Sequence, residues 1–190
     1  MAEIVTIDAS DVGTILSALW ASRGGRHVSS ERADLADAQV VLFGGSVGSI
    51  DALSDLLAGK LLIDCGRELE TEDGASLSRT QRIARALPRT PVVKAFCNPS
   101  TDVLRFVVKH GGPEIGTVYV SGLYCGDDPT AKTIVAGLIG ETNLDPVDCG
   151  GLSRSKLLDA VAALERHLDA RYAMTSIGVK RDGSPADSFF

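Results

Sequence analysis

Short apolar runs recur along this chain, and each is followed by a turn and then by apolar residues at helical spacing. The runs expected as strands cover residues 4–7, 40–43, 60–64, 91–96, 117–121 and 145–148. Helices are expected over residues 12–20, 50–57, 76–87, 101–108, 130–139 and 153–168. Strands that alternate with helices need crossover connections, so the sheet should be parallel with helices on both faces.

One strand–helix unit is missing or reduced near the N-terminus. Residues 27–30 form at most a stub of strand before the next apolar run at residue 40. We therefore predict an α/β fold, a shortened Rossmann-type doubly wound, mainly parallel sheet with C-terminal helices. The expected boundaries are a dinucleotide-binding region over 1–122, a C-terminal α/β extension packed on it over 123–179, and a tail over 180–190 that shows no periodicity.

The acidic composition restricts the classes of partner. The 190 residues carry a formal net charge of -6, with 44% hydrophobic and 23% charged residues, which is ordinary globular composition. Nucleic acid and anionic lipid both select clustered Lys and Arg, so we expect neither nucleic-acid nor membrane binding. A small-molecule ligand is the expected partner. With no secretory segment before the first strand and no apolar run of roughly 18 residues, we expect a cytoplasmic location.

The cysteine and histidine spacings predict no metal site. The four cysteines form no CxxC pair, and the three histidines have no neighbouring Cys, Asp or Glu at ligand spacing. Free thiols in a reducing compartment are expected. Cys65 and Cys97 both fall near the carboxyl ends of expected strands, where a ligand would lie, so a reactive thiol or thiol pair is one hypothesis. Structural burial of both thiols is the alternative.

The turn after the first strand carries an eroded version of the glycine fingerprint G-x-G-x-x-G. The corresponding residues are Asp8, Ala9, Ser10, Asp11, Val12 and Gly13. Gly13 keeps the third glycine, which lets helix and strand pack closely. Asp8 and Ser10 carry side chains at the two positions where the fingerprint needs a tight turn and a close approach to phosphate.

Asp8 and Asp11 also introduce charge where a pyrophosphate would bind. A carboxylate about 6 Å from a phosphate charge costs on the order of 3 kcal/mol at an effective dielectric constant near 20. In the alternative interpretation, Asp11 stabilises the helix dipole and Asp8 forms the turn, with no functional role for either residue.

Several later segments match a known family in order along the chain. Residues 91–98 (PVVKAFCN) are similar to V-V-K-A-F-N-T, residues 126–132 (GDDPTAK) match G-D-D-x-x-A-K, and residues 144–152 (LDPVDCGGL) are similar to a stretch ending V-D-A-G-P-L. With residues 58–60 (AGK) before an expected strand, these segments resemble the NADPH-dependent deazaflavin reductase family, also described as deazaflavin-dependent NADP oxidoreductases.

The resemblance implies a cofactor, NADP(H), and hydride transfer between its nicotinamide and a small organic or deazaflavin acceptor. It implies that Ser30 and Arg32 contact the 2′-phosphate, with Arg26 or Arg23 as substitutes and a solvated arginine as the alternative. The remaining expected cofactor contacts are the turn residues Asp8, Ala9, Ser10, Asp11, Val12 and Gly13, together with Gly44, Gly45, Lys94, Ala95 and Phe96. No catalytic side chain is assigned.

The chain also departs from the family pattern. Residues 66–68 (GRE) replace a T-N-P turn, and Cys97 stands where asparagine is usual. Two alternatives to the oxidoreductase therefore stay open. One is a degenerate, non-catalytic relative that serves as a binding or assembly subunit, and the other is a biosynthetic enzyme with a changed ligand in the same pocket. An apolar stripe on the last expected helix is consistent with a homodimer.

Overall fold

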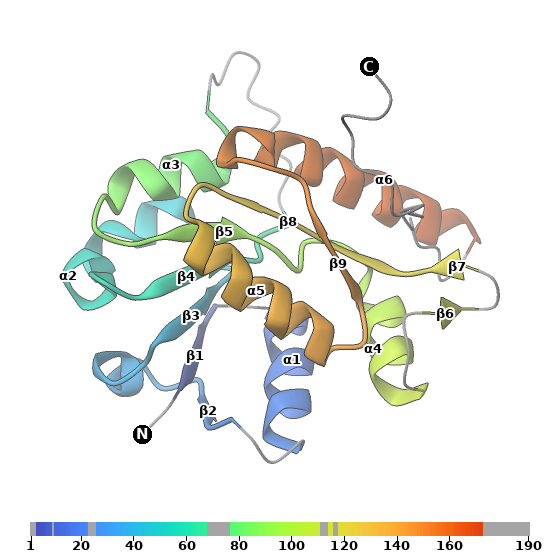
Figure 1. The fold of residues 1–190 in the computed structure, drawn as a ribbon, viewed down its shortest axis with the longest axis horizontal. Helices are drawn as coiled ribbons and strands as arrows, with labels where there is room; N and C mark the ends of the chain where they lie inside the picture. Colours follow the sequence, from blue (N-terminus) through green and yellow to red (C-terminus); the bar gives the residue numbers. More distant parts are fainter. Residues whose placement is uncertain are drawn as a thin grey trace.

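A seven-stranded sheet forms the centre of the computed structural model, which describes residues 3–8, 10–22, 26–67, 77–110, 114–115 and 118–172. The strand order is β2-β1-β3-β4-β5-β8-β9 (Figure 1). The strands are β1 (Ile4–Ile7), β2 (Val28–Ser29), β3 (Val40–Phe43), β4 (Leu61–Asp64), β5 (Val92–Lys94), β8 (Ser121–Gly126) and β9 (Asp145–Asp148). The predicted shortened, mainly parallel Rossmann-type sheet with C-terminal helices is confirmed.

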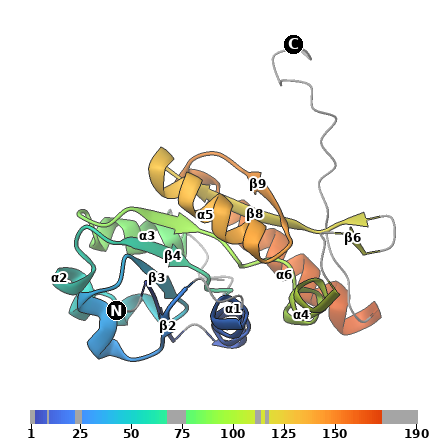
Figure 2. The ribbon, with the colours of Figure 1, turned by 60° about the horizontal axis from the view of Figure 1, so that its bottom comes forward.

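Side chains that alternate along the strands build a core on each face of the sheet. On β3, Val40 and Leu42 join one core, whereas Val41 and Phe43 join the other. The first core receives α1 (Ser10–Ser22), α4 (Thr101–His110) and α5 (Pro129–Glu141), and α1 and α4 lie side by side (Figure 2). The second core receives α2 (Ser54–Leu57) and α3 (Arg79–Ala86). Two residues of α6 (Ser155–Tyr172), Leu158 and Ala162, pack in a smaller cluster with β8.

One strand pair is the antiparallel exception in the mainly parallel sheet. β5 and β8 are antiparallel, with Val93 opposite Gly126. The connection between them contains α4 and the antiparallel pair β6 (Glu114–Ile115) and β7 (Val118–Tyr119), so the chain re-enters the sheet in the reverse direction. The single strand expected over 117–121 is therefore wrong, because its described residues divide between β7 and β8.

The reduced unit after α1 is confirmed. β2 has two residues and is followed by a 3-10 turn, Arg32–Ala36, where a complete unit would place a helix. The helix expected over 50–57 is also shorter than predicted. Two 3-10 turns, Val47–Ser49 and Asp51–Leu53, precede the four residues of α2. Leu56 of this helix is exposed.

The later part of the chain continues the same sheet. β8 pairs with β9 in parallel, and α5 connects them on the face that carries α1 and α4. In the part of the chain that the structure describes, no helix has the length and apolar character needed to cross a membrane. The predicted tail over 180–190 lies outside the described residues.

Candidate functional site

The turn between β1 and α1 places the eroded fingerprint at the carboxyl edge of the sheet. β1 ends at Ile7, Asp8 follows with a φ of 47°, and α1 begins at Ser10. A positive φ is the conformation that glycine adopts without strain, which explains why the fingerprint places glycine there. Asp8 therefore keeps the backbone path of the turn and adds a carboxylate to it. Ala9 lies outside the described residues.

A cavity of about 530 Å³ opens beside this turn. Its lining residues come from β1 and the turn after it, from α1 and from the segment that follows β2. They are Thr6, Ile7, Asp8, Gly13, Thr14, Ser17, Ser30 and Arg32. The structure thus brings together four of the predicted contact residues, two of which carry opposite charges. Asp11 is exposed on the first turn of α1, and Val12 is buried in the core beneath the helix.

Gly44 and Gly45 lie next to this turn but do not line the cavity. The Gly44 amide donates a hydrogen bond to the Ile7 carbonyl, which holds the end of β3 against the end of β1. A Cβ atom on Gly45 would stand 2.7 Å from Oδ2 of Asp8. Gly45 therefore makes room for the Asp8 side chain.

Lys94, Ala95 and Phe96 are separated from the cavity by their burial. All three are at most 2% exposed, and Phe96 packs edge-on against Trp20 with 6.0 Å between ring centroids. The Lys94 ammonium faces the α3 and α6 side of the sheet. A cofactor contact by these three residues stays a prediction.

Two of the candidate arginines lie in different surroundings. The guanidinium of Arg26 pairs with Glu3 and Glu141, and these carboxylates hold it away from a phosphate role. Arg32 is exposed at the start of its 3-10 turn and lines the cavity. Arg23 lies outside the described residues.

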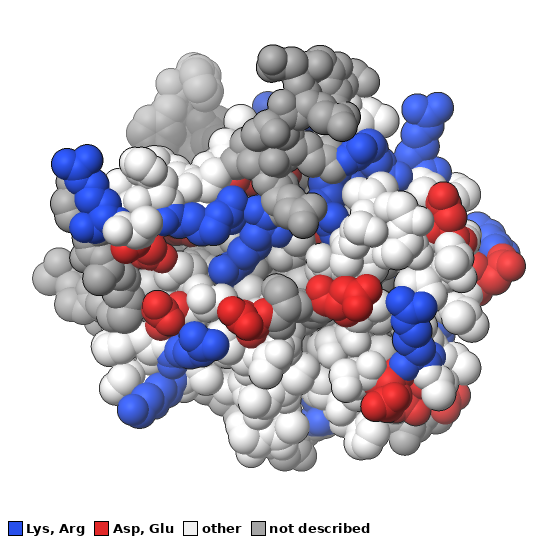
Figure 3. All heavy atoms as spheres, turned by 180° about the vertical axis from the view of Figure 1, so that it is seen from behind, with Lys and Arg blue, Asp and Glu red and all other residues white. Residues whose placement is uncertain are grey.

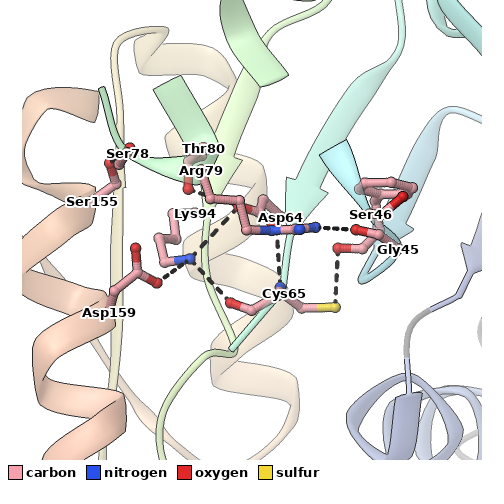
Figure 4. Close-up of polar contacts among 12 residues, drawn as sticks. Gly45, Ser46, Asp64, Cys65, Ser78, Arg79, Thr80, Lys94, Ser155 and Asp159 are labelled. Carbon is pink, nitrogen blue, oxygen red and sulfur yellow. Dashed lines mark hydrogen bonds and ion pairs between the residues drawn. The ribbon is translucent and has the colours of Figure 1, made fainter. Parts of the chain in front are cut away.

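A buried charge cluster, absent from the sequence predictions, fills the carboxyl ends of β4 and β5 (Figure 4). Asp64 and Lys94 are register partners on these strands, with 3.6 Å between their charged atoms. Arg79 of α3 lies 3.0 Å from Asp64, and Asp159 of α6 lies 2.8 Å from Lys94. We call Asp64, Arg79, Lys94 and Asp159 the strand-end cluster. It ties α3 and α6 to the sheet.

The electrostatics of this cluster favour charged side chains despite their burial. Burial raises the pKa of Asp64, but the positive charges of Lys94 and Arg79 outweigh that effect and hold the pKa below its usual value. Burial alone would lower the pKa of Lys94, yet the carboxylates of Asp64 and Asp159 raise it. The pKa of Asp159 is raised, chiefly by burial and in spite of Lys94.

The cysteines are free, and burial of Cys65 and Cys97 is confirmed. Burial raises the pKa of Cys65 to about 12 and that of Cys97 to about 11. A thiol with such a pKa stays protonated at neutral pH and is a poor nucleophile. The Sγ atom of Cys65 lies 3.3 Å from the Phe43 carbonyl oxygen, to which it donates a hydrogen bond. The reactive-thiol hypothesis is therefore disfavoured.

The sheet topology, the turn after β1 and the adjoining cavity define a Rossmann-type protein. No protein-family model matches the chain. Among curated proteins it is similar to the F420-dependent NADP reductase of Methanocaldococcus jannaschii, with 26% identity over 145 residues, 71% of this chain and 62% of that protein. It is also 31% identical over 123 residues to metalloreductase STEAP3 of Rattus norvegicus, covering 64% of this chain and 24% of that protein.

Solved structures agree in fold. A putative F420-dependent NADP reductase from Arthrobacter sp. FB24 superposes with a TM-score of 0.76 at 20% identity, covering 95% of this chain and all of that one. A reductive aminase from Aspergillus terreus, in complex with NADPH and ethyl-5-oxohexanoate, gives a TM-score of 0.60 at 15% identity, with 91% and 63% covered. These similarities support the predicted resemblance to the F420-dependent NADP reductases, with this chain as a divergent relative. It spans less than two thirds of the length of the two curated relatives.

Proposed function

We propose that this protein binds NADP(H) in the cavity beside Asp8. The supporting observation is that one cavity gathers Gly13 of α1 with Ser30 and Arg32 of the segment that follows β2. In the proposed pose, the 2′-phosphate lies against the Arg32 guanidinium and the Ser30 hydroxyl, and the pyrophosphate lies at the N-terminus of α1. The cavity residues fit the 2′-phosphate end well. The Asp8 carboxylate opposes the pyrophosphate and weakens its binding.

The proposed reaction is hydride transfer between the nicotinamide and a small organic or deazaflavin acceptor. NADP reductases among the relatives support this class of reaction. When bound, the cofactor supplies the hydride chemistry. In the proposed pose, the nicotinamide and the acceptor meet over the carboxyl ends of β4 and β5. The ion pairs of the strand-end cluster connect these strand ends to α3 and α6.

A thermal unfolding titration tests the proposal. NADPH at about 100 times its dissociation constant stabilises a protein by roughly 2.7 kcal/mol, so the unfolding midpoint should rise measurably. NADH should bind more weakly, and Arg32→Gln should remove the preference for NADPH over NADH. Arg89→Gln is the matched control, because Arg89 is an exposed arginine that pairs with Asp55 away from the cavity. An unchanged midpoint in NADPH would contradict the proposal.

A second candidate is a non-catalytic binding or assembly subunit. Two observations favour it: Lys94, Ala95 and Phe96 are withdrawn into the core, and α6 exposes Leu157 and Leu164. This candidate predicts that NADPH leaves the unfolding midpoint unchanged and that no nicotinamide is turned over. Detectable oxidation of NADPH with any acceptor would rule it out.

A further inference from the structure

Arg67 follows β4, and Arg166 lies on α6, the helix that contacts the end of β5 through Asp159. Arg67 lies three residues after the last residue of β4, and its Nη2 atom donates a 2.6 Å hydrogen bond to the Pro99 carbonyl. This bond joins the end of β4 to the loop that precedes α4. The Nε atom of Arg67 is buried and has no hydrogen-bond partner among the residues that the structure describes.

Arg166 is the second arginine, and its position on α6 relates it to the sheet. It lies two helical turns after Asp159, which contacts Lys94 at the end of β5, and one turn after the buried Ala162. The face of α6 that packs on the strands therefore includes Arg166. Its Nη1 atom is also buried and lacks a hydrogen-bond partner within the described part of the chain.

Among the described residues near these arginines, positive charges outnumber negative ones. Asp64 and Asp159 are already paired with Arg79 and Lys94. Besides burial, the charge of Arg166 lowers the pKa of Arg67, so the two guanidiniums lie within electrostatic range. Glu165 is the carboxylate that partly offsets them. Together with the strand-end cluster, this gives four positive side chains against three negative ones.

Basic side chains also lie on the surface near α3 and α6. Figure 3, which shows the molecule from behind, has several Lys and Arg side chains across its upper half, with Asp and Glu side chains among and below them. Arginine N–H groups are the donors that bind carboxylate and phosphate most strongly, and buried donors without an acceptor are costly.

From these observations we infer that Arg67 and Arg166 form an anion subsite that receives a carboxylate or phosphate group of the second substrate. Ligands of open α/β sheets bind at the carboxyl ends of the strands, and β3 separates this position from the cavity at the end of β1. The assignment to a second substrate rests on the proposed function. Binding of the anion itself does not.

Inorganic phosphate is the probe. We expect low-millimolar phosphate to raise the unfolding midpoint of the wild-type protein in a saturable manner, relative to sodium chloride of equal ionic strength. Arg67→Gln and Arg166→Gln should each weaken phosphate by roughly tenfold or more, because each removes charge-assisted hydrogen bonds. Arg89→Gln should behave like wild type. If Arg67→Gln does not fold, Arg67→Lys keeps the charge, loses the planar donor fork and should still weaken phosphate.

Arg32→Gln separates this subsite from the NADP(H) cavity. Phosphate stabilisation that survives Arg32→Gln and disappears in Arg166→Gln supports the inference. Stabilisation that depends on Arg32 alone, or that is equal in all variants, overturns it. NADPH titration of the same variants keeps the two proposals distinct. If the wild-type protein does not bind NADPH, the proposed function is rejected. Phosphate binding that depends on Arg67 and Arg166 would still support the anion subsite.

Discussion

The carboxylate of Asp8 lies against the backbone of Gly45, where a Cβ atom would come within 2.7 Å of Oδ2. Asp8 occupies the first glycine position of the fingerprint, and Gly45 follows β3, the neighbouring strand. Asp8, which follows β1, thus has room for its side chain because Gly45, which follows β3, has none. This pairing explains how the turn keeps its backbone path although the glycine is lost.

Replacement of Gly45 by alanine should therefore destabilise the protein. The new methyl group would also stand 3.0 Å from the Asp8 Cβ and from the Phe43 ring, so we expect a loss of about 1–3 kcal/mol in urea unfolding. Gly48→Ala is the control, because nothing lies within 4 Å of a Cβ there. In the double variant with Asp8→Gly, the loss should shrink, since two of the three close contacts come from Asp8. Equal losses with and without Asp8 would contradict this account.

Neutralising Asp8 should strengthen cofactor binding. The carboxylate lines the cavity next to the proposed pyrophosphate position, and it is exposed, so solvent screens part of the repulsion. We expect Asp8→Asn to lower the dissociation constant of NADPH by roughly tenfold, and the gain should diminish at high salt. Fluorescence titration of the bound nicotinamide measures it. Weaker binding in Asp8→Asn would instead indicate a ligand that is cationic or donates hydrogen bonds to Asp8.

Loss of the Asp64 charge should be among the most destabilising single changes. Asp64→Asn preserves the shape but leaves two buried cations, Lys94 and Arg79, without their shared carboxylate. Removing one partner of a buried ion pair costs about 3–5 kcal/mol. Asp55→Asn is the matched control: its carboxylate is 98% exposed beside Arg89, and an exposed pair contributes at most about 1 kcal/mol. If Asp64→Asn lowers the free energy of unfolding by less than Asp55→Asn does, the strand-end cluster does not stabilise the fold.

The same carboxylate should make stability depend on acid pH. The pKa of Asp64 is lowered in the folded protein, so its contribution is fully present above the unfolded value near 4 and is lost as the pH falls through the folded pKa. The difference in unfolding free energy between wild type and Asp64→Asn should therefore shrink below about pH 4. The pKa of Asp159 is raised, so protonation of Asp159 favours the folded state, and its contribution to stability should become more favourable as the pH falls. Urea unfolding at several pH values provides the measurement, and a difference that does not change with pH would contradict it.

Local patterns in the sequence predict much of the sheet but little of the strand-end cluster. The run Val40–Phe43 is apolar on both faces, and this identifies a buried strand without further information. Asp64 and Lys94 also stand out, because each is a charged residue that ends an apolar strand. Their partners could not be predicted, since Asp159 reaches Lys94 only through the packing of α6 on the sheet.

Two further differences have a tertiary origin. The direction of β8 is set by the path through α4 and the β6–β7 pair, which hydrophobic periodicity does not record. Of the predicted contacts, the cavity gathers Asp8, Gly13, Ser30 and Arg32, because β1 pairs with β2 and α1 packs beside β2. Lys94, Ala95 and Phe96 lie at the end of β5, and only the completed core shows that all three are buried.

The apolar stripe on α6 gives a prediction about assembly. Leu157 and Leu164 are two turns apart on one face, and they are 58% and 50% exposed. Two large leucines exposed on the same helix face are consistent with a homodimer that covers this stripe.

In sedimentation velocity, the double variant Leu157→Lys and Leu164→Lys should shift the protein toward the monomer, because charged side chains at such an interface oppose burial. Ile134→Lys on α5, where Ile134 is 44% exposed, is the control and should leave the sedimentation coefficient unchanged. A wild-type protein that sediments as a monomer at high concentration would exclude the homodimer.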